Sequence, residues 1–231
     1  MKVVLISGAS SGIGLALTNK MLSLGYYVIG VSRTITQQHC NHENFEPIQA
    51  DLSEEKSTKV FLELIKKRSI FILINCAGFG KFEPHEELNI KTITKMTFLN
   101  LTTPMLLTNT LLRTLKKNDG YLININSIEA LRASKFAGVY SATKAGLKAF
   151  GDALFEETRR TNLSITNINP DMTFTPFYDT LRFQPTQNEN EKLLVEDIVS
   201  AVEHILTMRK GAVVSEYTIR SLQFGIQKKK I

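Results

Sequence analysis

Short apolar runs alternate with longer amphipathic stretches along most of this chain. The apolar runs are brief, and several are rich in Val and Ile, as expected for strands buried on both faces of a sheet. They predict strands at residues 3–7, 27–31, 46–50, 70–75, 121–126 and 163–169. The amphipathic stretches between them predict helices at residues 12–24, 54–67, 88–115, 137–161 and 195–209.

This alternation predicts the fold class. Strands joined through helices form parallel sheets, and the helices cover both faces of the sheet. We therefore expect an α/β fold with a doubly wound parallel sheet in three layers, formed as a single domain by residues 1–231. Residues 171–194 are polar, contain Pro and have no clear period, so they predict a long loop. A loop of that length in a compact domain is usually functional and often a lid.

Composition narrows the class of protein. No apolar run approaches the ~20 residues that cross a bilayer, and the start MKVVLISGASSGIG fits a first strand better than a secretory signal. The two cysteines, Cys40 and Cys76, fit a reducing compartment rather than a disulfide framework. We therefore expect a cytoplasmic protein with no membrane partner.

Charge adds little to this picture. The net charge is +6 and the pI is about 9.2, which raises the possibility of a nucleic-acid or membrane-surface partner. However, Lys and Arg are spread along the chain, and their one dense run, residues 228–230, predicts a solvated, disordered end. We expect no nucleic-acid partner, only a basic surface with affinity for an anionic ligand.

A glycine-rich loop follows the first predicted strand and opens the first predicted helix. Gly8, Gly12 and Gly14 stand where missing side chains let the backbone approach a pyrophosphate, and the helix N-terminus offers free N–H groups. The spacing is G-x-x-x-G-x-G rather than the common G-x-G-x-x-G. A tight strand–helix turn without a ligand is the alternative reading of the loop taken alone.

Several motifs together resemble the short-chain dehydrogenase/reductase family of the classical type. They are the glycine loop, with Ser7 where Thr is more usual; Asn75-Cys76-Ala77-Gly78; Asn100; Ser127; Tyr140-x-x-x-Lys144; and Asn169-Pro170. Tyr140 follows Ser127 by 13 residues, as in the family. The resemblance runs from Val3 to about Met208 and implies a Rossmann fold. The chain's end lacks the family's Gly-Gly tail, so the family's usual tetramer is not expected here.

The resemblance implies the chemistry of the site. Tyr140 and Lys144 lie at i and i+4, on one face of a helix. A free Tyr has a pKa of ~10, and a nearby ammonium in a closed site brings it toward ~7. By resemblance, Tyr140 is the general acid or base, Ser127 orients the substrate oxygen, and Asn100 holds a water that links Lys144 to bulk proton donors. The implied activity is hydride transfer between NADP(H) and a small-molecule ketone, aldehyde or secondary alcohol.

The end of the second predicted strand bears on the choice of dinucleotide. NAD-preferring sites place an acid about 20 residues after the glycine loop. Here Ser32 and Arg33 follow instead, and a guanidinium can hold a 2′-phosphate bidentately. We therefore expect NADP rather than NAD. The full set expected to bind the cofactor is Gly8, Ser10, Ser11, Gly12, Ile13, Gly14, Ser32, Arg33, Asp51, Leu52, Asn75, Ala77, Gly78, Tyr140, Lys144, Pro170, Thr173 and Thr175.

Other readings stay open at this point. Asp51 can serve only as the N-cap of helix 54–67, or also lie near the adenine as the resemblance implies. A non-catalytic dinucleotide-binding regulator is the main alternative function, and an isomerase or dehydratase is another. His39, Cys40 and His42 offer metal-ligand types, but they predict a solvated loop, and we expect no metal site. By resemblance, helices 88–115 and 137–161 form a homodimer. The substrate depends on residues 128–136 and 171–194 and is not specified.

Overall fold

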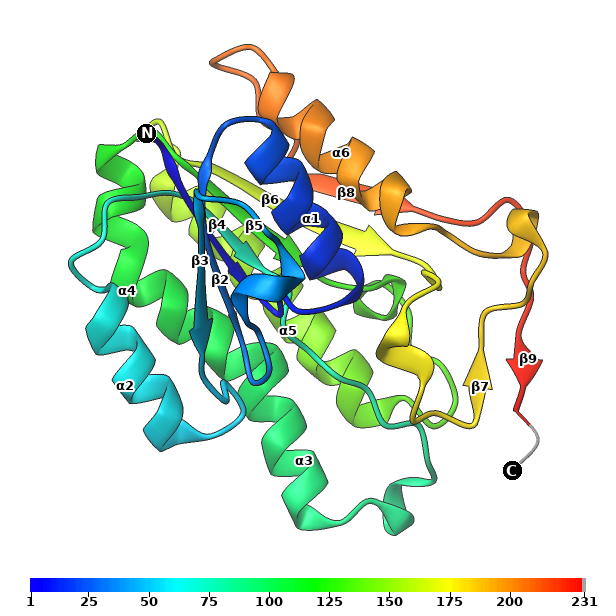
Figure 1. The fold of residues 1–231 in the computed structure, drawn as a ribbon. Coiled ribbons are helices and arrows are strands. Elements are labelled where there is room, and N and C mark those ends of the chain that lie inside the picture. Colours follow the sequence, from blue (N-terminus) through cyan, green and yellow to red (C-terminus); the bar gives the residue numbers. More distant parts are fainter. Residues whose placement is uncertain (230–231) are drawn as a thin grey trace.

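The computed structural model describes residues 1–229, and its centre is a parallel sheet of seven strands (Figure 1). The strands are β1 (Val3–Ser7), β2 (Tyr27–Ser32), β3 (Phe45–Gln49), β4 (Ile70–Asn75), β5 (Tyr121–Ile125), β6 (Ser164–Pro170) and β8 (Glu216–Ile219). Their order is β3-β2-β1-β4-β5-β6-β8, and every neighbouring pair is parallel. The chain reverses direction across the sheet after β3, so the carboxyl ends of β1 and β4 flank the switch point where ligands bind in such folds.

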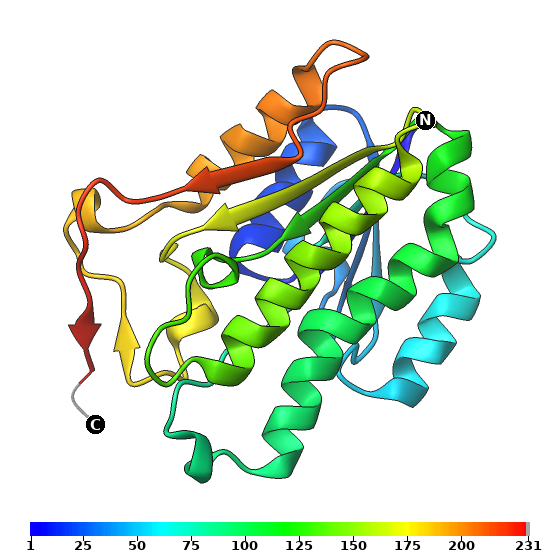
Figure 2. The same ribbon diagram turned by 180° about the vertical axis from the view of Figure 1, so that it is seen from behind.

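Helices cover both faces of the sheet. The helices are α1 (Gly12–Ser23), α2 (Glu55–Ile65), α3 (Ile90–Thr97), α4 (Thr103–Lys117), α5 (Gly138–Thr158) and α6 (Val195–Thr207). Figure 1 shows α1 and α6 in front of the sheet, and Figure 2 shows α4 and α5 in front of its other face. Two apolar cores result: one contains Leu17 and Val202 from α1 and α6, and the other contains Phe61 and Leu111 from α2 and α4. The predicted doubly wound Rossmann sheet is confirmed.

The predicted helix 88–115 is not one regular helix. Between α3 and α4 the chain forms a π-helical turn, Phe98–Thr102 (η3), in which the N–H of Thr103 donates to the carbonyl of Phe98. Pro104 follows in the first turn of α4, and because it has no N–H it cannot donate to the carbonyl of Asn100. Single π turns inside helices commonly mark functional positions, and this one contains Asn100, which is fully buried.

A row of buried asparagines ties the middle strands to α5. Asn75, Asn124 and Asn167 are register partners on β4, β5 and β6. The Asn75 amide donates to Asn124 over 2.9 Å, and the Asn124 amide donates to Asn167 over 3.1 Å. Asn167 in turn donates to the carboxylate of Asp152 on α5 over 2.9 Å. Buried amides that are paired in this way fix the position of α5 on the sheet.

Residues 171–194 are more ordered than a plain loop. They form a bridge between Thr173 and Leu193, two single turns at Pro176–Tyr178 (η5) and Glu189–Glu191 (η6), and a short strand, β7 (Phe183–Gln184). Strand β7 pairs antiparallel with β9 (Gln227–Lys228), and Figures 1 and 2 both show the C-terminal segment beside it. We call residues 171–194 the lid segment and residues 220–229 the tail.

The tail is bonded to the lid segment along its length. The N–H of Gln223 donates to the carbonyl of Asn190 over 2.7 Å, and the N–H of Lys229 donates to the carbonyl of Arg182 over 2.9 Å. The ammonium of Lys229 also donates to the carbonyl of Tyr178. The prediction of a disordered end at residues 228–230 is therefore wrong for Lys228 and Lys229, although Lys228 is exposed to solvent as predicted. Lys230 lies outside the described residues.

Candidate active site

The side chains of Tyr140 and Lys144 project from the first two turns of α5 toward the end of β5. Both are buried, with 7% and 5% of their surface exposed. The ammonium of Lys144 donates to the carbonyl of Ile125 over 2.9 Å and lies 5.9 Å from the centroid of the Tyr140 ring. The small residues of this helix let other elements come close: a Cβ on Gly146 would lie 3.2 Å from the side chain of Leu101.

Ser127 stands directly after the polar end of β5. Its hydroxyl accepts a hydrogen bond of 3.2 Å from the N–H of Glu129, which caps the single turn Ile128–Ala130 (η4). The Ser127 side chain remains partly exposed. A hydrogen bond between Ser127 and Tyr140 acts to lower the pKa of the Tyr140 phenol, against the effect of burial. Ser127 and Tyr140 thus present two hydroxyl groups side by side.

Burial dominates the protonation of the two α5 side chains. It raises the pKa of Tyr140 to about 12, against the lowering effect of Ser127 and with a further rise from Glu129. It lowers the pKa of Lys144 to about 8, opposed by the nearby Cys76. The predicted Tyr140 pKa near 7 is therefore wrong for this structure, because desolvation of the phenolate outweighs any effect of the ammonium. At pH 7 the phenol keeps its proton, and most of the Lys144 side chains are charged.

Asn100 is held against the loop that follows β4. Its side-chain oxygen accepts from the N–H of Phe79 over 3.1 Å, and its amide donates to the carbonyl of Phe79 over 2.9 Å. A Cβ on Gly78 would lie 3.1 Å from Asn100 and 3.7 Å from the ammonium of Lys144. The structure therefore brings Asn100, Gly78 and Lys144 together, as the sequence predicted.

The glycine loop packs against the same post-β4 loop. Gly8 and Gly12 have φ of +74° and +51°, and a Cβ on Gly14 would lie 2.1 Å from the carbonyl oxygen of Gly8. The hydroxyl of Ser7 accepts from the N–H groups of Cys76 and Ala77 over 3.0 and 3.1 Å. The loops after β1 and β4 are thus fixed side by side at the switch point of the sheet.

The start of α1 fits an anionic group. Ser11 is the N-cap, but its side chain makes no capping bond, and the first turn contains no acid. The N–H groups of a helix start need partners, and phosphate is a common one. Ser10 and Ile13 flank this start, and Thr175 returns to it, since a Cβ on Gly12 would lie 3.2 Å from the Thr175 side chain. These residues fit a dinucleotide lying between the glycine loop and the lid segment.

The carboxyl ends of β2 and β3 lie next to that of β1 at the same edge of the sheet. Asp51 accepts from the N–H and the hydroxyl of Ser53 over 2.9 and 2.6 Å. Burial raises the pKa of Asp51, but these bonds and the charges of Arg33 and Lys95 together lower it. Helix α2 begins only at Glu55, with Glu54 as its N-cap, so the prediction of Asp51 as the N-cap is wrong. Leu52 is buried beside it.

Arg33 is exposed at the end of β2, and Ser32 accepts from the N–H of Thr34 over 3.3 Å. Among residues 1–229, no carboxylate lies within ion-pair distance of Arg33. The guanidinium is therefore available to a ligand. Sequence reasoning missed a second nearby cation, Lys95 on α3, whose ammonium lies 2.6 Å from the carboxylate of Glu54.

Comparison with known proteins identifies the family. Residues 2–185 match the family model described as short chain dehydrogenase. The chain belongs to the short-chain dehydrogenase family. An uncharacterized oxidoreductase of Staphylococcus epidermidis is 30% identical over 228 residues, covering 95% of this chain and 96% of the relative.

Solved structures agree with this assignment. An alcohol dehydrogenase from the archaeon Thermococcus sibiricus, complexed with 5-hydroxy-NADP, has the same fold, with a TM-score of 0.85 at 24% identity over 97% of this chain and 99% of that chain. A 4-hydroxyisoleucine dehydrogenase complexed with NADH has a TM-score of 0.80 at 26% identity over 96% and 97% of the two chains. The family and these relatives make the protein an oxidoreductase. No helix within residues 1–229 is long and apolar enough to cross a membrane.

This short-chain dehydrogenase has an ionic cluster beside Ser127 that the sequence analysis did not predict. Asp171 follows the last residue of β6 and is 9% exposed. Its carboxylate lies 3.8 Å from the guanidinium of Arg132 and 3.4 Å from that of Arg220. Glu129 accepts from Ser134 over 2.6 and 2.9 Å and contacts Arg132 at 3.6 Å. The cluster joins the end of β6, the post-β5 loop and the tail.

Pro170, Thr173 and Thr175, which were predicted to bind the dinucleotide, lie at the end of β6 and in the lid segment. Pro170 ends β6, and the hydroxyl of Thr173 donates to the carbonyl of Asp171 over 3.0 Å. The candidate metal ligands have other partners: the Cys40 thiol donates to Asn19, and His42 accepts from Asn44. Within residues 1–229 no cluster of His, Cys, Asp and Glu could hold a metal ion.

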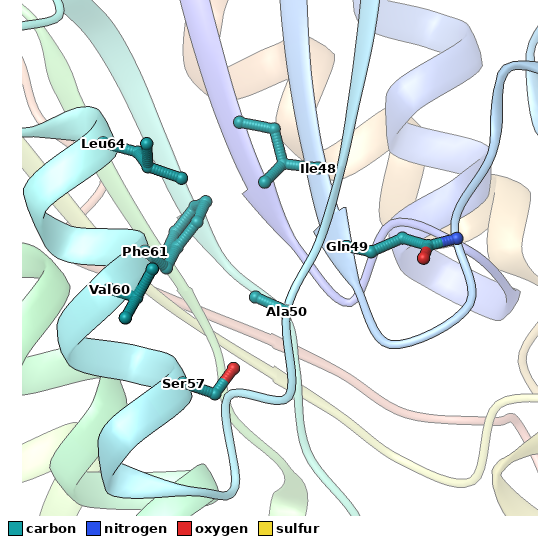
Figure 3. A pocket seen from close by; sticks show the side chains of 7 residues that line it. All are labelled: Ile48, Gln49, Ala50, Ser57, Val60, Phe61 and Leu64. Atoms are coloured by element: carbon teal, nitrogen blue, oxygen red, sulfur yellow. The ribbon is translucent and has the colours of Figure 1, made fainter.

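A separate depression lies between β3 and α2 (Figure 3). Figure 3 shows Ile48, Val60, Phe61 and Leu64 around it. It contains none of the predicted catalytic side chains, so it is distinct from the candidate active site.

Proposed function

We propose that this enzyme reduces a ketone or aldehyde to an alcohol with NADPH, and that Tyr140 donates the proton. The observation that carries the proposal is the protonated, buried phenol of Tyr140 beside the Ser127 hydroxyl. Burial raises the pKa of Tyr140 to about 12, so the phenol holds its proton at neutral pH and has one to give to a carbonyl oxygen.

The neighbouring side chains assist the proton transfer. Ser127 donates a hydrogen bond to the carbonyl oxygen and holds it near the phenol. The ammonium of Lys144 stabilises the phenolate that forms, and its effect is strong because the site is buried. A bound reduced dinucleotide supplies the hydride that the carbonyl carbon takes up. Pro104 has no N–H to donate to the carbonyl of Asn100, so Asn100 is suited to hold a water close to Lys144.

The preference for NADP rests on Arg33. Its exposed guanidinium has no ion-pair partner among residues 1–229, and Ser32 brings no negative charge to the end of β2. A guanidinium binds a phosphate through two parallel hydrogen bonds. Arg33 is therefore the residue that distinguishes the 2′-phosphate of NADPH from the hydroxyl of NADH.

The remaining parts of the proposal concern closure and assembly. The lid segment closes over the dinucleotide, which is supported by the approach of Thr175 to Gly12. Residues 1–231 act as one domain, and two copies pair through helices α4 and α5, which lie side by side on one face of the sheet (Figure 2). A regulator without activity is less well supported, because it needs no aligned Ser127, Tyr140 and Lys144.

The test is a panel of aldehydes, ketones, 3-oxoacyl esters and steroids assayed by the oxidation of NADPH and of NADH. Tyr140→Phe is the decisive variant, and Tyr217→Phe on β8 is its control, because Tyr217 lies beside His204 and outside the site. Turnover that survives in Tyr140→Phe, or is lost equally in both variants, contradicts the proposal.

A further inference from the structure

Aromatic rings gather directly around Tyr140. The ring of Phe82 lies 5.3 Å from the Tyr140 ring, and the ring of Phe177 lies 5.9 Å from it, measured between centroids. Phe183 and Tyr178 complete the group: Phe183 is 5.1 Å from Phe82, and Tyr178 is 5.1 Å from Phe177. We call Phe82, Phe177, Tyr178 and Phe183 the aromatic cluster.

The aromatic cluster is not part of the cores that hold the fold together. Neither of the two apolar cores contains any of its members. Phe82 comes from the loop after β4 and the other three come from the lid segment, and all four are only partly buried. Partly exposed apolar rings grouped over a reactive hydroxyl are typical of a binding surface rather than of a core.

The backbone is also adapted to this group of rings. A Cβ on Gly80 would lie 2.6 Å from the Phe82 ring and 2.8 Å from the Phe177 ring. Both rings thus need glycine at this position to come as close to the post-β4 loop as they do. The post-β4 loop and the lid segment thus each bring one ring, Phe82 and Phe177, against Tyr140.

The charges around the site are already paired. Arg132 and Arg220 face the carboxylate of Asp171, and Arg132 also faces Glu129. The two guanidiniums nearest Ser127 thus already have carboxylate partners. The aromatic cluster is uncharged, so the surface next to Tyr140 favours a neutral molecule.

We propose that the substrate is a neutral ketone or aldehyde that carries an aromatic ring, with this ring packed against Phe82 and Phe177 while the carbonyl oxygen meets Ser127 and Tyr140. This inference rests on the proposed function, because it concerns the same site. Aromatic rings prefer edge-to-face or offset contacts at the centroid distances found here. Each such contact corresponds to about 2- to 10-fold in affinity over an equally apolar, saturated contact.

The experiment uses three ketones of equal carbon number: 4-phenylbutan-2-one, 4-cyclohexylbutan-2-one and decan-2-one. None has a ring conjugated with its carbonyl, so their intrinsic reactivities are matched. We expect kcat/KM with NADPH to be at least ~10-fold higher for the phenyl ketone, mainly through KM. Phe82→Leu and Phe177→Leu should each reduce this preference by about 2- to 10-fold. Phe174→Leu is the matched control, because Phe174 lies in the lid segment but is 47% exposed and faces Lys192.

A binding measurement separates this inference from the proposed function. Saturation-transfer NMR on the Tyr140→Phe variant with NADPH ranks the same three ketones without turnover. If none is reduced with either dinucleotide, the proposed reduction of such ketones fails, and the NMR ranking still decides whether the site selects aromatic rings. Equal ranking of the phenyl and cyclohexyl ketones, or a preference that Phe82→Leu, Phe177→Leu and Phe174→Leu leave alike, overturns the inference.

Discussion

Replacing Lys144 with Met should remove a buried charge that destabilises the fold at neutral pH, and it should also remove activity. The side chain is buried, and burial lowers the pKa of Lys144 from 10.5 to about 8. A lysine with a lower pKa in the folded state than in the unfolded state binds its proton less well when folded. At pH 7 it is charged in both states, so folding must desolvate the charge. The cost is 1.36 kcal/mol for each pH unit, or ~3 kcal/mol in all.

The sign of the pH dependence distinguishes this effect from other consequences of the substitution. Between pH 8 and pH 10.5 the unfolded chain binds more protons at Lys144, so the stability of the wild type rises with pH relative to Lys144→Met. Met also leaves the Ile125 carbonyl without its donor, which costs ~1–3 kcal/mol. That loss is the same at every pH, so only the slope reports on the buried charge.

Urea unfolding of both proteins between pH 7 and pH 10 measures the slope. Lys148→Met is the control, one turn further along α5. Ion pairs with Asp152 and Glu216 raise the pKa of Lys148, so its contribution is present below pH 10.5 and does not change between pH 7 and pH 10. A constant free-energy difference between the wild type and Lys144→Met over this range would refute the reasoning.

Further predictions concern catalysis and binding. Tyr140→Phe should lower kcat by ~10²–10⁴-fold yet leave NADPH affinity nearly unchanged, as a fluorescence titration beside a rate assay will show. Arg33→Ala should remove a preference for NADPH over NADH of at least ~10-fold in kcat/KM, since one charge-assisted contact contributes ~1.5–3 kcal/mol; equal use of the two cofactors by the wild type would show that Arg33 was misread. Reduction should decline above about pH 8 as the Lys144 ammonium loses its proton, and a profile that stays level to pH 10 argues against its role. Cofactor should protect the lid segment from hydrogen exchange, and identical protection with and without it contradicts closure.

Most of the central sheet could be predicted because its strands are apolar and its helices have a clear apolar face. Strands β1 and β4 were predicted to the residue. The last strand of the sheet, β8, was missed, because it lies at an edge and alternates exposed Glu216 with half-buried Tyr217. Strands β7 and β9 were missed for another reason: each has two residues, and each exists only because the other lies beside it.

The site was predictable only where a motif has a fixed spacing. Tyr140 and Lys144 are one helical turn apart, and the structure brings them together with Ser127 and Asn100. No local spacing relates Phe82 to Phe177, or Asp171 to Arg220, because these contacts depend on how distant segments cross. The pKa of Tyr140 was predicted in the wrong direction, since a sequence gives the charge of a neighbour but not the degree of burial.

The pairing of the tail with the lid segment has a practical consequence for protein engineering. A fusion joined at the C-terminus would start next to Lys229, whose ammonium and N–H bond to the carbonyls of Tyr178 and Arg182. The N-terminus lies at the opposite end of the sheet, at the amino end of β1 (Figure 1). Purification tags therefore belong at the N-terminus. A tag at the C-terminus would strain these bonds and displace the lid segment, so kinetic constants measured on such an enzyme would not describe the native site.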